Sequence, residues 1–314
     1  MKQKTVMYTL CGICAVLAPL FTNYYSQYLL NLLIIYMLVT LGFNLTLGYA
    51  GRFSFANATL FGIGAYCVGL LMRHFSIPFW LSLPMAGVVA GIFGYGLGFI
   101  ALRLHRYYLA VVTLAFMFLM KFIYIHGGEI TYGPSGFDIP NPSVFGYDIV
   151  GDKKIYYIVL IISFVLFVIL RNIIQSPIGR SFAAIRDNEN AAEAMGIDAN
   201  RATVLAFAIS GFVVGIAGGL LGIVIRRVTP DSFGLVELTK HFIMVVLGGL
   251  GSIAGSLIGA VLILLLQEVL RGIQEYQEFV FGSLIVVFVL VAPQGLYGLA
   301  VDYLPGVSRE KLYR

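Results

Sequence analysis

The residues of this chain whose types and pattern could suit hydrolysis are Ser135 and the four histidines. Ser135 stands in a Gly-Pro-Ser-Gly pattern at 133–136, which could suit a membrane serine protease. Such a nucleophile should begin a spanning helix and meet a histidine inside another span. Ser135 is instead followed by the loop sequence FDIPNPSVFGYD, and we expect every histidine near a span end, namely His74, His105, His126 and His241. No catalytic triad follows from this arrangement.

Cysteines and lysines exclude two further kinds of site. Cys11 and Cys14 have the C-x-x-C spacing of redox and zinc motifs, but they lie in an apolar run without a nearby histidine or acid. We interpret them, like Cys67, as packing residues and expect no disulfide and no metal. None of the seven lysines follows a glycine, so a phosphate-cradling G-x-x-x-x-G-K-[ST] loop is missing. We expect a chain that is not an enzyme and has no cofactor of its own.

One segment, 176–202, is rich in charge: seven of its 27 residues are charged, against 35 of 314 in the whole chain, and its sequence is SPIGRSFAAIRDNENAAEAMGIDANRA. The stretches on either side, IYYIVLIISFVLFVIL and TVLAFAISGFVVGIAGGLLGIVI, carry no charge. Residues 176–179 predict a turn, and 181–195 predict a short helix whose apolar stripe is Phe182, Ile185, Ala192 and Met195. Gly196 suits the left-handed position after a helix, and Asp198 or Asn200 could cap the next span. Such a helix can dock into a groove of a soluble partner; the alternative is a solvated connecting loop.

Two glycine-rich breaks resemble each other. Residues 47–51 read LGYAG and are followed by Gly64-Ala65, and residues 247–251 read LGGLG and are followed by Gly259-Ala260. Backbone N–H and C=O groups that lose their helical hydrogen bonds at such a break must be packed in protein or line a water-filled cavity. Corresponding breaks in two halves of a transporter point to a substrate path, whereas close helix packing through small residues is the alternative.

The composition is that of a membrane protein. Hydrophobic residues make up 60% of the 314 residues and charged residues 11%, and the mean hydropathy is +0.93. A soluble domain is about half apolar and one quarter charged. We therefore predict one all-α, polytopic membrane domain over 1–314, with about 8–10 spanning helices and no nucleic-acid partner. Predicted spans are 7–22, 28–48, 58–73, 77–101, 107–126, 155–171, 202–225, 236–249, 253–270 and 277–292.

Lysine and arginine counts set the orientation of these spans. With a cytoplasmic N-terminus, twelve cations lie inside: Lys2, Lys4, Arg52, Arg103, Arg106, Arg171, Arg180, Arg186, Arg201, Arg309, Lys311 and Arg314. Seven lie outside: Arg73, Lys153, Lys154, Arg226, Arg227, Lys240 and Arg271. This bias requires that 236–270 be two helices broken at LGGLGS. It makes 1–27 a retained first helix and turn, 127–154 an external loop and 172–201 a cytoplasmic loop.

Six stretches in order carry a family resemblance. The charged segment with its following span resembles the cytoplasmic coupling loop of LivM-type permeases, the membrane subunits of branched-chain amino-acid ABC importers. The stretches LGFNLTLGYAGRFSFANATLFGIGAY, LRLHRYYLAVVTLAF, TYGPSGFDIP, PDSFGLVELTKHFIMVVLGGLGSIAGSLIGA and APQGLYGL resemble further parts of that family over roughly 40–300. Urea and short-amide ABC permeases are close relatives of the same family.

The resemblance implies a set of partners and two sets of site residues. The partners are a second homologous permease, two cytoplasmic ATPase subunits that bind the ATP, an external solute-binding protein and the bilayer of a bacterial inner membrane. The coupling loop would meet the ATPase through Gly179, Arg180, Phe182, Ile185, Arg186, Glu189, Glu193 and Gly196. We place the translocation path at Gly48, Gly51, Arg52, Ser54, Asn57, Lys121, Gly248, Gly249 and Gly251.

Several positions depart from the family pattern. The family commonly has Gln, Gly and His where this chain has Arg52, Ala56 and Asn57, and often an acid and an Arg where it has Phe118 and Lys121. If Arg52 and Lys121 face the path, they favour a carboxylate over a zwitterion; otherwise they are an inside-loop charge and a snorkelling lysine. The expected solute is a branched-chain amino acid. The alternatives are urea, a short amide or a small carboxylate and, more distantly, a secondary transporter or channel.

Overall fold

The computed structural model describes residues 18–19, 22–104, 106–144, 147–148, 151–291 and 295–298. Apart from residues 18, 19 and 22, the expected first span 7–22, with Cys11 and Cys14, lies outside this part. The same holds for the C-terminal cations from Arg309 onward and for the N-terminus that we expect in the cytoplasm.

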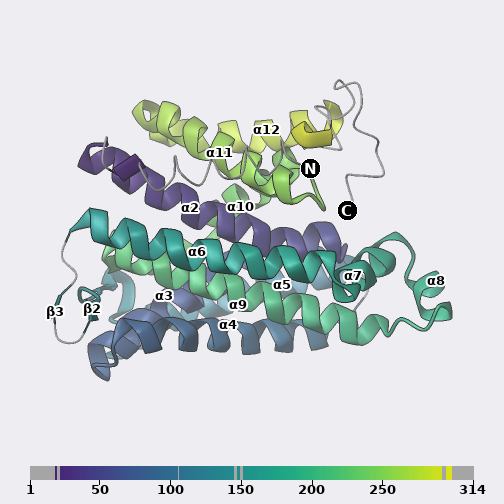
Figure 1. Ribbon diagram of the computed structural model, residues 1–314, viewed down its shortest axis with the longest axis horizontal. Helices are drawn as coiled ribbons and strands as arrows, with labels where there is room; N and C mark the ends of the chain where they lie inside the picture. Colours follow the sequence, from purple (N-terminus) through teal and green to yellow (C-terminus); the bar gives the residue numbers. More distant parts are fainter. Residues whose placement is uncertain are drawn as a thin grey trace, which may run out of the picture.

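The chain is an all-α bundle of long helices that run side by side along one axis (Figure 1). Its helices are α2 (Tyr24–Asn44), α3 (Asn57–His74), α4 (Phe79–Ala101), α5 (Arg106–His126), α6 (Asp152–Gln175), α7 (Pro177–Asp187), α8 (Glu189–Ala194), α9 (Ala199–Ile225), α10 (Leu235–Gly248), α11 (Ile253–Val269) and α12 (Gln277–Val291). A π-helical turn, Leu45–Tyr49, continues α2, and 3-10 turns occupy Gly133–Ser135, Pro230–Phe233 and Leu270–Tyr276.

Among the described residues, six helical stretches are long and apolar enough to cross a membrane: Tyr24–Tyr49, Phe79–Ala101, Tyr107–His126, Lys153–Gln175, Ala199–Ile225 and Ile253–Ile273. The shorter helices α3, α10 and α12 occupy the places of three other predicted spans. The all-α, polytopic membrane fold is thus confirmed. Each predicted span within the described residues corresponds to one helix, because an uninterrupted apolar run bounded by polar or glycine-rich residues marks a spanning helix in any sequence.

The helix α9 forms the centre of the bundle and packs against α3 and α4 through glycines. A Cβ at Gly64 would clash with the Gly215 carbonyl of α9, and one at Gly94 would clash with the Phe207 carbonyl. Small residues let membrane helices approach until their backbones touch. This contact explains why so apolar a chain is also rich in glycine, and it fixes α3, α4 and α9 as a rigid scaffold.

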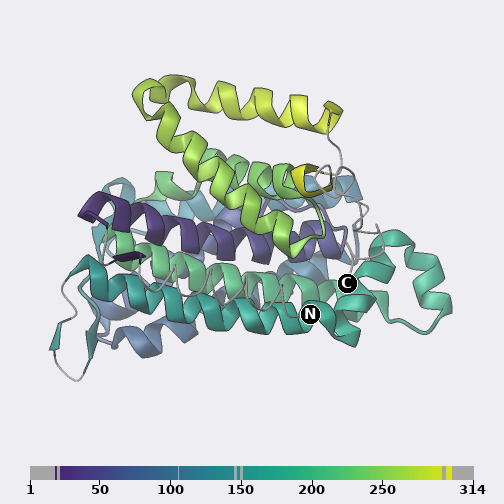
Figure 2. The same ribbon diagram turned by 45° about the horizontal axis from the view of Figure 1, so that its top comes forward.

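The two ends of the bundle differ. One end carries the short helices α7 and α8, and the other carries two small antiparallel β pairs (Figures 1 and 2). There β1 (Phe137–Asp138) pairs with β4 (Arg227–Val228), and β2 (Ser143–Val144) pairs with β3 (Tyr147–Asp148). The predicted loops 127–154 and 172–201 therefore lie at opposite ends, as alternating spans require. We refer to these as the strand end and the α7–α8 end.

The segment 236–270 forms two helices, as the charge count required. α10 ends at Gly248, and α11 begins at Ile253 after a four-residue turn. A Cβ at Gly259 would clash with the Met244 carbonyl, so the two helices lie against each other as a hairpin. α10 has 14 residues and is therefore ~21 Å long, shorter than the ~30 Å of hydrocarbon.

Candidate functional site

The first glycine-rich break interrupts the bundle between α2 and α3. The last turn of α2 widens into the π-helix Leu45–Tyr49, and residues 51–56 then run without helical structure to α3. Gly51 adopts a φ of +65°, a conformation that side chains other than glycine rarely adopt. Single π-helical turns occur frequently at functional sites because they leave backbone groups available.

The second break has the same character. Gly249 has a φ of +130° and Gly251 a φ of +71°, which turns the chain between α10 and α11. The Ser252 hydroxyl accepts a hydrogen bond of 3.1 Å from the Gly255 amide and so caps α11. The predicted likeness between the two breaks thus extends to their backbone, since both combine a helix end with a left-handed glycine.

The two breaks meet at the side chain of Asn44. Its amide nitrogen donates to the Ser252 carbonyl at 3.1 Å and to Ser256 Oγ at 2.7 Å, and its Oδ1 accepts from the Gly251 amide at 2.9 Å. A Cβ at Gly48 would clash with Asn44 Oδ1 and with the Gly251 nitrogen. The backbones of the two breaks are therefore in direct contact. Asn44 was not predicted, although an asparagine within so apolar a run is a signal for it.

The charged segment forms two short helices rather than one. Ser176, expected in a turn, caps α7 by accepting from the Ile178 amide, and Asn188 ends α7 and caps α8 by accepting from the Ala191 amide. Phe182, Ile185 and Ala192 are buried within this chain, whereas Met195 is exposed, so the four residues do not form the single apolar stripe that we expected to meet a partner. The expected stripe rested on the spacing of apolar residues alone, which does not indicate that Asn188 ends one helix and caps the next.

The connection from α8 to α9 follows the prediction. Gly196 has a φ of +84°, and Asp198 caps α9 through a 2.9 Å bond from the Arg201 amide. Gly179 lies against the end of α6, because a Cβ there would clash with the Ile174 carbonyl. Arg180 and Glu193 are exposed at this end of the molecule.

Arg186 of α7 joins the charged segment to both breaks. Its Nη1 donates a 3.0 Å hydrogen bond to the Gly48 carbonyl, while its Nη2 lies 2.9 Å from Asp187 Oδ1. A Cβ at Gly51 would overlap the Arg186 side chain, and one at Gly251 would lie 2.8 Å from its Nη1. The guanidinium thus occupies the point where α7 and the two glycine-rich breaks come together.

A second ion pair strengthens this contact. Arg52, directly after the first break, pairs with Glu189 at the start of α8. Both line a cavity of about 460 Å³ at the α7–α8 end, together with Arg103, Tyr107 and Asn200. The predicted residues Gly48, Gly51, Arg52, Arg186, Glu189 and Gly251 are therefore brought together in one place, which we call the break junction.

Other predicted path residues lie away from the break junction. Ser54 is buried and accepts from the Ala56 amide at 3.2 Å. Lys121 lies toward the strand end, where its Nζ is 2.8 Å from Asp231 Oδ1. Since Arg52 and Lys121 each have an acidic partner, the positive charge that favoured a carboxylate solute is compensated, and that hypothesis gains no support.

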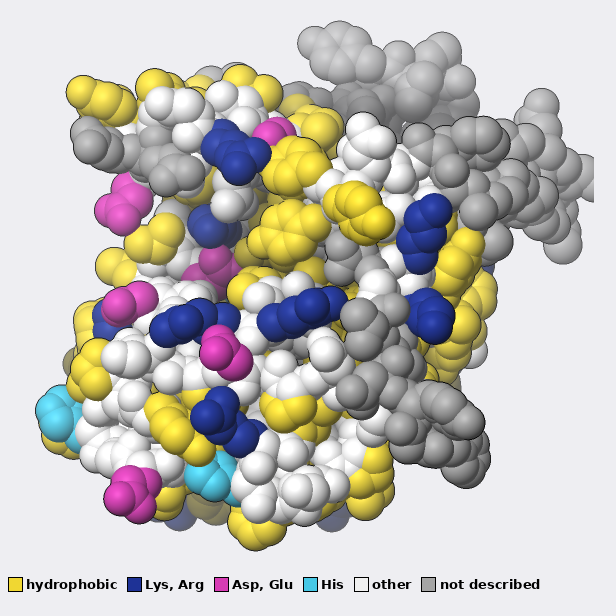
Figure 3. All heavy atoms as spheres, turned by 90° about the vertical axis from the view of Figure 1, so that its left-hand side faces the viewer, with side chains coloured by type: hydrophobic (Ala, Val, Ile, Leu, Met, Phe, Trp, Pro, Cys, Tyr) yellow, Lys and Arg dark blue, Asp and Glu magenta, His cyan; other side chains and the backbone are white. Residues whose placement is uncertain are grey.

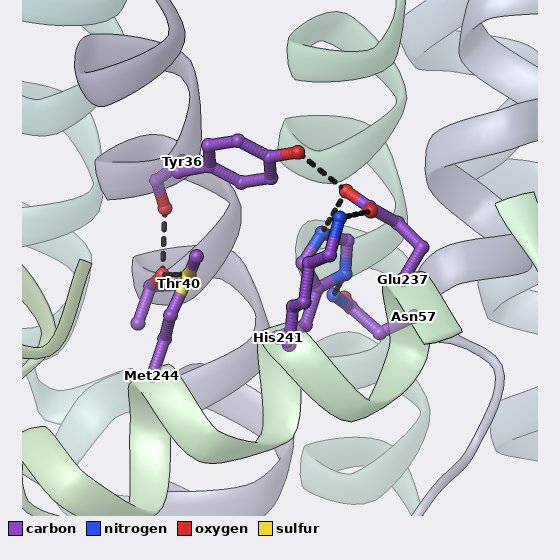
Figure 4. Close-up of polar contacts among 7 residues, drawn as sticks. Tyr36, Thr40, Asn57, Glu237, His241 and Met244 are labelled. Carbon is purple, nitrogen blue, oxygen red and sulfur yellow. Dashed lines mark hydrogen bonds and ion pairs between the residues drawn. The ribbon is translucent and has the colours of Figure 1, made fainter. Parts of the chain in front are cut away.

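A cluster of buried polar side chains joins α2, α3 and α10 (Figure 4). Glu237 is its centre: its Oε1 accepts a 2.7 Å bond from the Tyr36 hydroxyl, and its Oε2 accepts one of 3.1 Å from Lys240 Nζ. His241 Nε2 lies 3.3 Å from Glu237 Oε1, and His241 Nδ1 lies 3.0 Å from Asn57 Nδ2. We call Tyr36, Asn57, Glu237, Lys240 and His241 the buried polar cluster.

Only Asn57 of this cluster was predicted as a site residue. His241 was expected near a span end, but it lies in the middle of α10 and is fully buried. The signal in the sequence is the spacing of Glu237, Lys240 and His241, because residues three and four apart share one face of a helix. Among the described residues, no group of three or more His, Cys, Asp or Glu side chains could hold a metal ion.

The strand end presents a mixed charged surface. Lysine and arginine side chains alternate there with acidic ones (Figure 3). Arg73 donates to the Tyr132 hydroxyl and to the Asp138 carbonyl, and Arg227 Nη1 lies 3.8 Å from Asp138 Oδ1. These contacts hold the loop after α5 against the loop after α9.

Comparisons with known proteins match nearly the whole chain. A family model described as "Branched-chain amino acid transport system / permease component" matches residues 25–289. The high-affinity branched-chain amino acid transport system permease protein LivM of Salmonella typhimurium is 31% identical over 319 residues, which cover 94% of this chain and 75% of the relative. LivM of Escherichia coli is 30% identical with the same coverage. The corresponding LivH of Salmonella typhimurium is 29% identical and covers 84% of this chain and 91% of its own. No solved structure matches the chain.

Proposed function

The chain belongs to the family of permease components of branched-chain amino acid transport systems, and from that premise we propose its complete role. It is the membrane-spanning subunit of an ABC importer that moves branched-chain aliphatic amino acids into a bacterial cell across the inner membrane. Its N-terminus and its α7–α8 end face the cytoplasm. Two cytoplasmic ATPase subunits hydrolyse the ATP, and an external binding protein delivers the solute.

The similarity to LivH as well as LivM supports a second, related permease as partner. Both LivM and LivH relatives match the same chain, as expected if two permeases share one fold. A pore made of this chain and a homologue would place two break junctions at the same end of the complex. Each ATPase subunit would then meet one α7–α8 unit.

The break junction is the observation that carries the mechanism. In this proposal, the exposed surface of α7 and α8, with Ile178, Met195 and the charges of Arg180 and Glu193, docks on an ATPase subunit. Movement of α7 shifts Arg186, which bonds the Gly48 carbonyl of the first break and contacts Gly251 of the second. Movement of α8 shifts Arg52 through Glu189. Both breaks thus respond to one displacement, and the two helices they end, α2 and α10, change position together.

A transport assay tests this proposal. The chain is produced with its partner permease, the ATPase subunits and the binding protein in a bacterium that lacks its own branched-chain amino acid import, and uptake of labelled leucine is measured. We expect uptake that requires ATP and stops when either this chain or the ATPase subunits are omitted. Uptake by this chain alone, or uptake of urea in place of leucine, would overturn the proposal.

A further inference from the structure

The buried polar cluster places two full charges where a membrane bundle ordinarily has none. The side chains of Glu237 and Lys240 are 8% and 13% exposed, and His241 is fully buried. Charged groups inside a membrane protein are costly, face the interior of the bundle and mark solute or ion pathways by default. All three lie on α10, which leads directly into the second break.

The chemistry of the cluster matches the two ends of an α-amino acid. Glu237 offers a carboxylate, which an ammonium group can approach, and Lys240 offers an ammonium, which a carboxylate can approach. Tyr36 and Asn57 add a hydroxyl and an amide from α2 and α3. An amino acid carries both of its charges on neighbouring atoms, so one molecule can reach both partners.

The cluster also has unused hydrogen-bonding capacity. Asn57 Oδ1 and His241 Nε2 are buried without a hydrogen-bond partner, although His241 Nε2 lies within ion-pair distance of Glu237. Buried polar atoms are nearly always paired in folded proteins, so the unpaired Asn57 Oδ1 in this cluster calls for an explanation. A polar ligand that displaces the internal contacts would supply the missing partner.

Aromatic side chains enclose the cluster. The His241 ring lies 5.3 Å from the Phe61 ring and 5.9 Å from the Tyr36 ring, and the Phe61 ring lies 5.8 Å from that of Phe233. This apolar wall suits an aliphatic side chain, which would leave water on entering. A small polar solute such as urea has no aliphatic side chain and would gain no free energy of binding from these rings.

We propose that Glu237 and Lys240 form a transient binding site for zwitterionic aliphatic amino acids within the translocation path. The ammonium of the solute takes the place of Lys240 at Glu237, and its carboxylate takes the place of Glu237 at Lys240. The exchange leaves the net charge of the site unchanged, so the solute enters without an uncompensated charge in the bundle. This inference rests on the proposed function and names the site within it.

The test uses the complete transporter in liposomes and measures leucine molecules moved per ATP hydrolysed. The variants are Glu237→Gln, Lys240→Met and the double variant, which removes both charges and leaves no unpaired ion. Loss of charge-assisted bonds predicts a ratio ~10-fold lower for the double variant, with melting temperature and binding-protein-stimulated ATP hydrolysis close to wild type. A purely structural pair predicts the opposite, namely recovery of transport in the double variant, and that result would overturn the proposal.

Two further variants keep the test decisive. Glu237→Asp retains the negative charge and shortens the side chain. The transporter with this variant should therefore assemble even if transporters with the neutral variants do not. We expect Glu237→Asp to lower the transport ratio, and an unchanged ratio would also refute the site. Arg271→Met combined with Glu268→Gln removes a largely exposed ion pair outside both sites and should leave the ratio unchanged. A wild-type complex that moves no leucine would contradict the proposed function itself.

Discussion

At the scale of single residues, the glycines of the break junction are positions of backbone contact. Gly48 lies so close to Asn44 and to the Gly251 amide that any Cβ there requires the two breaks to separate. We expect Gly48→Ala to lower the free energy of unfolding by about 1–3 kcal/mol, the usual cost of overpacking, and to reduce uptake. The melting temperature of the purified complex measures this effect.

Gly96 provides the matched control for that substitution. It lies in α4, where a Cβ would meet no atom within 4 Å. Gly96→Ala should therefore leave the melting temperature unchanged or slightly raised, since alanine favours a helix over glycine. Equal effects of the two substitutions would show that close contact at Gly48 does not matter.

Asn44 makes a second prediction at this scale. Asn44→Leu keeps the size of the side chain but leaves the Gly251 amide, the Ser252 carbonyl and Ser256 Oγ without this partner. Each buried polar group without a partner costs about 1–3 kcal/mol, so we expect a complex with a markedly lower melting temperature. Asn200→Leu, at the exposed start of α9, is the control. If both variants melt alike, the breaks do not depend on Asn44.

At the scale of elements, the question is how α7 and α8 act on the long helices. Arg186 bonds the Gly48 carbonyl, and loss of one charge-assisted hydrogen bond corresponds to about a tenfold change in an equilibrium constant. We expect Arg186→Met to lower ATP-driven leucine uptake ~10-fold while ATP hydrolysis by the complex continues. Uptake and hydrolysis are measured side by side in the same liposomes.

Arg201→Met is the appropriate comparison for Arg186→Met. Arg201 is also an arginine near the charged segment, but its side chain is 90% exposed and pairs only across the surface with Asp198. Surface ion pairs contribute little, so this variant should transport like wild type. Normal transport by Arg186→Met would show that coupling does not pass through the Gly48 contact.

The long helices could be predicted from the sequence because the signal for them is local. An apolar run of about 20 residues has one stable conformation in lipid. Closely spaced glycines, as in LGYAG and LGGLG, indicate a helix break at that place in the sequence. The division of the charged segment into α7 and α8 could not be predicted from its apolar stripe, because it depends on Asn188 capping a new helix. A regular spacing of apolar residues does not reveal that a polar residue within the same stretch ends one helix and caps the next.

The buried polar cluster could not be predicted, because it depends on contacts between distant parts of the chain. Tyr36 and Glu237 are separated by 201 residues, and Asn57 and His241 by 184. Nothing near Tyr36 in the sequence indicates a carboxylate partner. The same limit applies to Arg186, which was predicted as a docking residue but whose bond to Gly48 appears only in the folded bundle.

At the scale of the whole molecule, α10 connects the two sites. It carries Glu237, Lys240 and His241 along its length and ends in the second break, whose Gly251 contacts Arg186. A displacement of α7 that moves this break therefore also moves the buried polar cluster relative to Tyr36 and Asn57. The structure thus supplies a continuous physical route from α7 and α8 to the charges inside the bundle.

The orientation of the molecule is the last prediction. Among the described residues, cations occur at both ends, so the twelve-to-seven bias depends on terminal residues outside them. In the proposed function, α7 and α8 contact an ATPase subunit, which is possible only in the cytoplasm. We expect Met195→Cys, at a position 83% exposed in this chain, to resist an impermeant maleimide added outside intact cells, and Ile130→Cys, at a position 65% exposed, to react.

Both variants are made in a chain from which Cys11, Cys14 and Cys67 have been replaced, so that each carries one cysteine. After the membrane is opened, Met195→Cys should react as fully as Ile130→Cys, because both side chains project from the surface. Labelling in the reverse order would place α7 and α8 outside the cell. The break junction would then have no access to ATP hydrolysis, and the coupling route through Arg186 would have to be abandoned.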